Sequence, residues 1–96
     1  MEKEIELPSG LKIELKELTM GEWETCLLYD AQMNKQYGTN IDVFYWSKYA
    51  QYATGWQEQR LKSMTKEDGE ALIVYLQDNE SAGRKGPQET ETIRKN

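Results

Sequence analysis

Residues 5–15 read Ile-Glu-Leu-Pro-Ser-Gly-Leu-Lys-Ile-Glu-Leu, and this stretch decides the first part of the fold. Apolar and charged residues alternate on both sides of Pro8-Ser9-Gly10, which is the period of strands with one buried and one solvated face. Proline presets φ and glycine permits positive φ, so the tripeptide predicts a tight turn. The sequence therefore predicts an antiparallel hairpin over residues 3–17. Because a two-stranded hairpin is marginal alone in water, we expect helices to cover its apolar face.

A helix is predicted directly after the hairpin, over about residues 20–36. Residues 19–22 read Thr-Met-Gly-Glu, the spacing of a capping box in which the threonine hydroxyl and the glutamate carboxylate bind each other's backbone N–H groups. Apolar residues then recur at helical spacing until a polar loop begins near Gly38. The expected buried side consists of Met20, Trp23, Leu27 and Ala31, with Cys26 alongside.

A second helix is predicted over residues 41–54, capped by Asn40 or Asp42 and ended by Gly55. Its apolar residues form two neighbouring stripes. The stripes are Val43, Trp46, Ala50 and Ala53 on one side, and Tyr45, Tyr49 and Tyr52 on the other. Residues 56–62 have no clean period, and we expect a turn or a short extended connection there.

A third helix is predicted over residues 66–79, because Thr65 is a good cap and acidic residues occupy the following turn. Its core side would be Leu72, Ile73, Tyr75 and Leu76. Residues 81–96 are polar and locally basic, which predicts a flexible tail. The expected fold is α+β: one domain over residues 1–80, with the hairpin packed on a small bundle of about three helices.

Composition excludes several classes of function. The chain has 96 residues, of which 38% are hydrophobic, and a net charge of -5, which disfavours binding to duplex nucleic acid or to an anionic membrane surface. The start of the chain lacks the basic and apolar regions of a signal peptide, and no apolar run is long enough to span a bilayer. We expect a soluble, cytoplasmic protein.

Catalytic chemistry has little support in the sequence. There is no histidine and Cys26 is the only cysteine, so intrachain disulfides and the common zinc-ligand spacings are excluded. Cys26 falls on the expected buried side of its helix, where a free cysteine usually acts as a small hydrophobic residue. Glycine-rich phosphate loops and calcium-binding loops are also missing. We expect a protein that is not an enzyme and has no cofactor.

The aromatic residues of the second helix are the candidate binding residues. Aromatic and basic residues alternate between residues 37 and 62, which is one way to stack single-stranded nucleic acid, but bases exceed acids there by only one. Protein binding is the stronger interpretation, because a small domain cannot easily cover two apolar stripes. The expected contact residues for a partner protein are Tyr45, Trp46, Tyr49, Tyr52 and Trp56.

The chain resembles small tail assembly proteins of tailed bacteriophages. Residues 5–22 fit the shared opening of apolar-x-Leu-Pro-(Ser/Asp)-Gly, a strand, Leu-Thr-x-Gly-(Glu/Asp) and a helix. Gly55-Trp56 and residues 61–72, which include Met-Thr-Lys-Glu-Asp at 64–68, are similar to how these proteins continue. The resemblance includes tail assembly chaperones and small baseplate-hub assembly proteins of contractile-tailed phages, and it transfers no catalytic residue.

The resemblance implies a chaperone that acts in the host cytoplasm. Such a protein would bind the tape-measure protein, tail-tube components or both during tail assembly, and a homo-oligomer is also compatible. The first alternative is a structural or assembly component of the baseplate hub, which would remain in the virion tail. The second is an acidic interaction module that regulates a host protein.

Overall fold

The computed structural model describes the backbone of residues 3–85 and the side chains of residues 3–79. Two strands precede four helices, which makes the fold α+β, as predicted. The elements are β1 (Lys3–Glu6), β2 (Lys12–Leu15), α1 (Met20–Tyr37), α2 (Val43–Thr54), α3 (Glu58–Lys62) and α4 (Lys66–Lys85).

The predicted hairpin is confirmed. β1 and β2 pair antiparallel, with Ile5 opposite Ile13 and Glu4 opposite Glu14. The turn is closed by the Gly10 N–H, which donates to the Leu7 carbonyl at 2.8 Å, and Gly10 has a φ of 94° that an L-residue rarely adopts. One face of the hairpin is therefore apolar and the other carries the charges.

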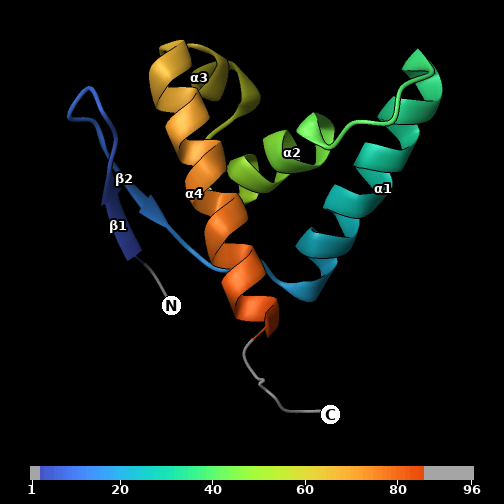
Figure 1. The fold of residues 1–96 in the computed structure, drawn as a ribbon, viewed down its shortest axis with the longest axis horizontal. Coiled ribbons are helices and arrows are strands. Elements are labelled where there is room, and N and C mark those ends of the chain that lie inside the picture. The colour runs from blue at the N-terminus through green and yellow to red at the C-terminus, as the bar shows by residue number, and fades with distance from the viewer. Residues whose placement is uncertain (1–2, 86–96) are drawn as a thin grey trace.

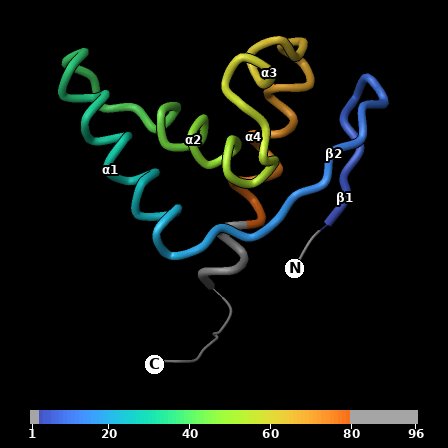
Figure 2. Tube along the Cα trace, turned by 180° about the vertical axis from the view of Figure 1, so that it is seen from behind, coloured from blue at the N-terminus to red at the C-terminus, as the bar shows by residue number. Residues whose placement is uncertain are grey.

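The elements form a row of hairpin, α4, α2 and α1 (Figures 1 and 2). The central helix α2 contacts α1, α4 and β2. The core joins residues from the hairpin and from three helices, and it covers the apolar face of the hairpin as expected. Its members are Leu7, Ile13, Leu15, Cys26, Tyr45, Trp46, Ala50, Ala53, Leu72 and Leu76.

Of the three predicted helix caps, Thr19 and Thr65 are present, whereas Asp42 is the N-cap residue of α2 by position but makes no side-chain capping bond. Thr19 Oγ1 accepts from the Glu22 N–H, and the Glu22 carboxylate accepts from the Thr19 N–H, so α1 begins with a complete capping box. Thr65 Oγ1 accepts from the Asp68 N–H at the start of α4. The Asp68 side chain does not reach back toward Thr65; it crosses to the hairpin.

Asp68 ties the hairpin turn to α4. Its carboxylate is only 3% exposed and accepts two hydrogen bonds from Ser9, one from the backbone N–H at 3.1 Å and one from the hydroxyl at 2.5 Å. Bonds to a charged acceptor are among the stronger hydrogen bonds in proteins. This pair fixes the hairpin against the start of the last helix, across 59 residues of sequence.

The predicted packing face of α1 is confirmed for Trp23, which is half-buried against the core, and for Cys26, but it is wrong for the other three residues. Met20, Leu27 and Ala31 are exposed, and only Cys26 on this helix is fully buried. Polar bonds also join α1 to α2: Asp30 Oδ1 accepts from the Tyr45 N–H at 3.2 Å and so caps the first turn of α2. Asn34, one turn further, binds both backbone groups of Ile41 in the connecting loop.

Two boundaries also differ from the prediction. Residues 58–62 form a helical turn rather than an extended connection, because they are good helix formers and Glu58 pairs with Lys62 at 2.8 Å. α4 continues to Lys85, so residues 81–85 are helical and do not belong to a tail. An established helix gains one hydrogen bond for each added residue, and polar residues can therefore extend it. The rest of the predicted tail, residues 86–96, lies outside the described residues.

Candidate functional site

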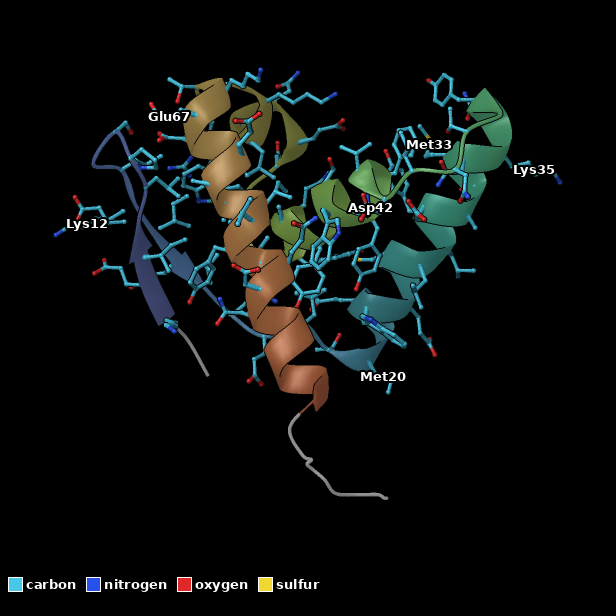
Figure 3. The ribbon with its side chains drawn as sticks, viewed as in Figure 1. Lys12, Met20, Met33, Lys35, Asp42 and Glu67 are labelled. Atoms are coloured by element: carbon cyan, nitrogen blue, oxygen red, sulfur yellow. The ribbon has the colours of Figure 1, made fainter. Side chains whose placement is uncertain are left out.

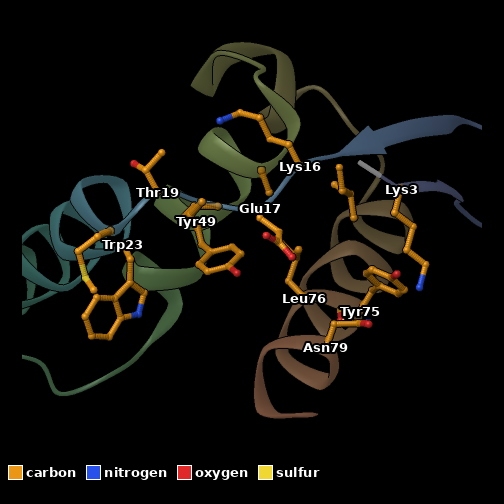
Figure 4. A pocket seen from close by; sticks show the side chains of 13 residues that line it. Lys3, Lys16, Glu17, Thr19, Trp23, Tyr49, Tyr75, Leu76 and Asn79 are labelled. Carbon is orange, nitrogen blue, oxygen red and sulfur yellow. The ribbon is translucent and has the colours of Figure 1, made fainter. Parts of the chain in front are cut away.

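A groove lies where α1, α2, α4 and the β2–α1 connection meet (Figure 4). Its volume is about 700 Å³, which is within the range of sites that enclose a small ligand or several side chains. The floor is aliphatic and comes from Leu15, Leu18, Ala53 and Leu76. We call this site the aromatic groove, because its walls carry three aromatic side chains: Trp23, Tyr49 and Tyr75.

Each aromatic wall residue comes from a different helix. Trp23 lies on α1, Tyr49 on α2 and Tyr75 on α4, and all three are half-buried against the core. The Tyr49 ring packs against two aromatic rings of the core: its centroid lies 5.4 Å from that of Trp46 and 5.9 Å from that of Tyr45. The groove therefore presents aromatic surface whose orientation is already set by core packing.

The mouth of the groove combines one exposed apolar side chain with a mixed polar rim. Met20, in the first turn of α1, is 69% exposed. Lys16 lies 3.4 Å from the Glu22 carboxylate. The pKa of Glu22 is lowered, chiefly because its carboxylate accepts a hydrogen bond from the Thr19 N–H. The nearby positive charge of Lys16 lowers this pKa further. Lys3 lies over the Tyr75 ring, 5.5 Å from its centroid.

One polar atom of the lining has no partner within the described part of the chain. The Tyr75 hydroxyl oxygen is buried, and no hydrogen bond to it is present among these residues. A buried hydroxyl without a hydrogen-bond partner costs free energy, so a ligand that supplies a partner here would gain from it.

The five residues that the sequence predicted to bind a partner lie in three different places in the structure. Tyr45 and Trp46 are core residues, 6% and 8% exposed, so the prediction that they form an uncovered face is wrong. Tyr49 lines the aromatic groove. Tyr52 and Trp56 are half-buried outside its lining, and the Arg60 guanidinium stacks on the Trp56 ring at 3.7 Å.

The sequence did not indicate Trp23 and Tyr75 as site residues. Both were expected in the core, because helical spacing of large residues does not distinguish a fully buried position from one that forms a groove wall. Both pack against the core and still reach the groove. The space between them depends on where α1 and α4 are each placed against α2.

A second groove of about 640 Å³ lies between α2, α3 and α4. Its lining combines aliphatic residues with polar and charged ones, and it contains none of the five predicted residues. Two ion pairs within helices occupy its rim, Glu58 with Lys62 and Lys66 with Glu70. It has no aromatic wall, and we call it the aliphatic groove.

The structure shows no metal-binding cluster in the part of the chain whose side chains it describes. Residues 3–79 contain no group of three or more acidic or cysteine side chains arranged to hold a metal ion. Cys26 is fully buried, as predicted. None of the described helices is both long and apolar enough to cross a membrane.

Comparisons with known proteins do not place the chain in a family. No protein-family model matches the chain, and neither a curated protein nor a solved structure matches it.

Proposed function

We propose that this protein is a tail assembly chaperone of a tailed bacteriophage and that its aromatic groove binds an amphipathic helix of the tape-measure protein. The observation that carries the proposal is the groove itself, in which tryptophan and tyrosine walls stand over an aliphatic floor. Tryptophan and tyrosine are the residues most enriched at the energetic centres of protein interfaces. The resemblance of residues 5–22 to tail assembly proteins supplies the class of client.

An amphipathic helix fits this groove better than a polar or rigid ligand does. Such a helix places large apolar side chains three and four residues apart on one face, and a groove of this volume holds a few of them. The exposed side chain of Met20 at the mouth adds an adaptable apolar contact. A long client with many such helices would otherwise aggregate through the same faces, which is why binding them serves assembly.

The surface charge supports solubility of the complex. The chain has a net charge of -5, and most of the charged side chains lie outside the groove floor. Lys3 and Lys16 at the rim provide partners for acidic residues that flank the apolar face of a client helix.

Co-expression with the tape-measure protein of the same phage tests the proposal. We expect the wild-type chain to keep the client soluble and to elute with it in size-exclusion chromatography. The Met20→Glu variant should bind at least tenfold more weakly, because it places a charge at the groove mouth. Its fold should be unchanged, since position 20 is exposed and an acidic residue favours a first helical turn.

A matched control comes from the same helix, about two turns further along. Leu28 is 71% exposed and does not line the aromatic groove, so Leu28→Glu should retain the client. Equal binding by the wild type and Met20→Glu would refute the groove as the site. A client that stays insoluble, together with this protein at fixed copy number in purified virions, would favour a baseplate component instead.

A further inference from the structure

The outer side of α1 is an unpartnered face that differs from the aromatic groove. Leu27 is 44% exposed and Leu28 is 71% exposed, although helices in small domains normally bury such residues. We call this surface the outer face of α1, and it consists of Glu24, Leu27, Leu28, Ala31 and Lys35, all of them exposed.

The placement of α1 leaves this face accessible. The helix lies at the end of the row of elements, on the side away from the hairpin (Figures 1 and 2). Figure 3 shows Met33 on the side of α1 toward α2, whereas Lys35 projects away from the rest of the molecule. No other described element covers the outer face.

The charges of the outer face are arranged for pairing with an antiparallel copy. Glu24 and Lys35 are separated by three helical turns, about 16 Å along the axis, and have opposite signs. Neither has an ion-pair or hydrogen-bond partner among residues 3–79, whose side chains the structure describes. The apolar residues Leu27, Leu28 and Ala31 lie between them.

A two-fold axis between residues 29 and 30 brings these features into register. Each Glu24 then faces Lys35 of the second copy, and each Leu28 faces Ala31, so that a large residue meets a small one. A parallel pair would instead place like charges opposite each other at both positions, which is unfavourable. The pattern of charges thus selects both the occupant and its direction.

We propose that the protein forms a homodimer through antiparallel pairing of the outer faces of α1. The contact is smaller than a standard interface of about 800 Å² per partner, because it uses one side of a single helix. Dissociation in the micromolar range or above is therefore expected. The dimer leaves both aromatic grooves open, since Leu27, Leu28 and Ala31 do not line them.

Charge exchange tests this interface in the full-length chain by sedimentation equilibrium from micromolar to millimolar concentration. The wild type should show a concentration-dependent dimer. Glu24→Lys and Lys35→Glu should each weaken self-association at least tenfold, because each creates two like-charge contacts. An equimolar mixture of these two variants should dimerise again, since both contacts in the heterodimer then join opposite charges.

Control variants distinguish a loss of dimerisation from a loss of folding and from a loss of client binding. Glu67→Lys makes the same charge change as Glu24→Lys on the far side of the molecule (Figure 3) and should dimerise like the wild type. Far-ultraviolet circular dichroism should be unchanged in all variants. A wild type that stays monomeric at millimolar concentration, or a mixture that fails to recover, overturns the proposal. Loss of dimerisation in Leu28→Glu with the client retained shows that the two surfaces act separately.

Discussion

Replacement of Asp68 by alanine should detach the hairpin from α4. The carboxylate is 3% exposed and receives the N–H and the hydroxyl of Ser9 at 3.1 and 2.5 Å. Hydrogen bonds to a charged group contribute about 1.5–3 kcal/mol each. In the Asp68→Ala variant, water can bind the exposed Ser9 and replace part of the lost hydrogen-bond energy. The variant also avoids the desolvation cost of a buried carboxylate. We therefore expect a net loss of about 2 kcal/mol for the two bonds together.

Thermal and urea unfolding followed by circular dichroism measure this loss. For a domain of this length, about 2 kcal/mol lowers the melting temperature by roughly 8–16 °C. Glu67→Ala is the matched control, because Glu67 is an exposed acidic neighbour in the same helical turn. A double-mutant cycle with Ser9→Ala isolates the hydroxyl bond, and it should show a coupling of about 1 kcal/mol. Equal stability of Asp68→Ala and Glu67→Ala, or a coupling near zero, would refute the reasoning.

Three further outcomes follow from single contacts. The pKa of Glu22 is lowered in the folded protein, so its capping contribution to stability is present above the ordinary glutamate pKa and is lost as pH falls through the lower, folded-state pKa. This loss lowers the melting temperature at acidic pH. The Glu22→Gln variant has no such carboxylate, so its melting temperature should lack this part of the decrease. Glu14→Lys should stabilise the hairpin by about 0.5 kcal/mol in urea unfolding, because Glu14 lies directly opposite Glu4, and a variant no more stable than the wild type would contradict this. Tyr75→Phe should leave the melting temperature equal or higher, since the buried hydroxyl lacks a described partner, yet weaken binding of the tape-measure protein severalfold in a titration; unchanged binding would exclude that hydroxyl from recognition.

The hairpin and the helix starts were predictable because their causes are local. The alternation around Pro8-Ser9-Gly10 and the capping box at Thr19 depend on neighbours within four residues, and both are present in the structure. The bond between Ser9 and Asp68 joins residues far apart in sequence, and no periodic signal accompanies it.

The packing face of α1 was not predictable from apolar spacing, because the helix carries two possible apolar sides. One side contains Leu27 and Ala31, and the other contains Cys26. In the structure, the side that contains Cys26 also carries Asp30, whose carboxylate accepts from the Tyr45 N–H of α2. Apolar spacing gives no signal for this polar contact between two helices.

Of the three aromatic residues that line the aromatic groove, only Tyr49 was predicted as a binding residue. Tyr45 and Tyr49 have the same residue type and the same helical spacing, but Tyr45 lies under α1 in the core and Tyr49 lies at the groove wall. The difference comes from where α1 and α4 meet α2, which is a property of the tertiary arrangement. Trp23 and Tyr75 became site residues for the same reason.

Site-specific photo-crosslinking to the tape-measure protein tests the central claim most directly. A photoreactive residue at position 20 lies at the mouth of the aromatic groove, and one at position 74 lies in the lining of the aliphatic groove. We expect a covalent adduct with the client from position 20 and none from position 74. An adduct from position 74 alone, or no adduct from either position in a complex that co-elutes, would contradict binding in the aromatic groove.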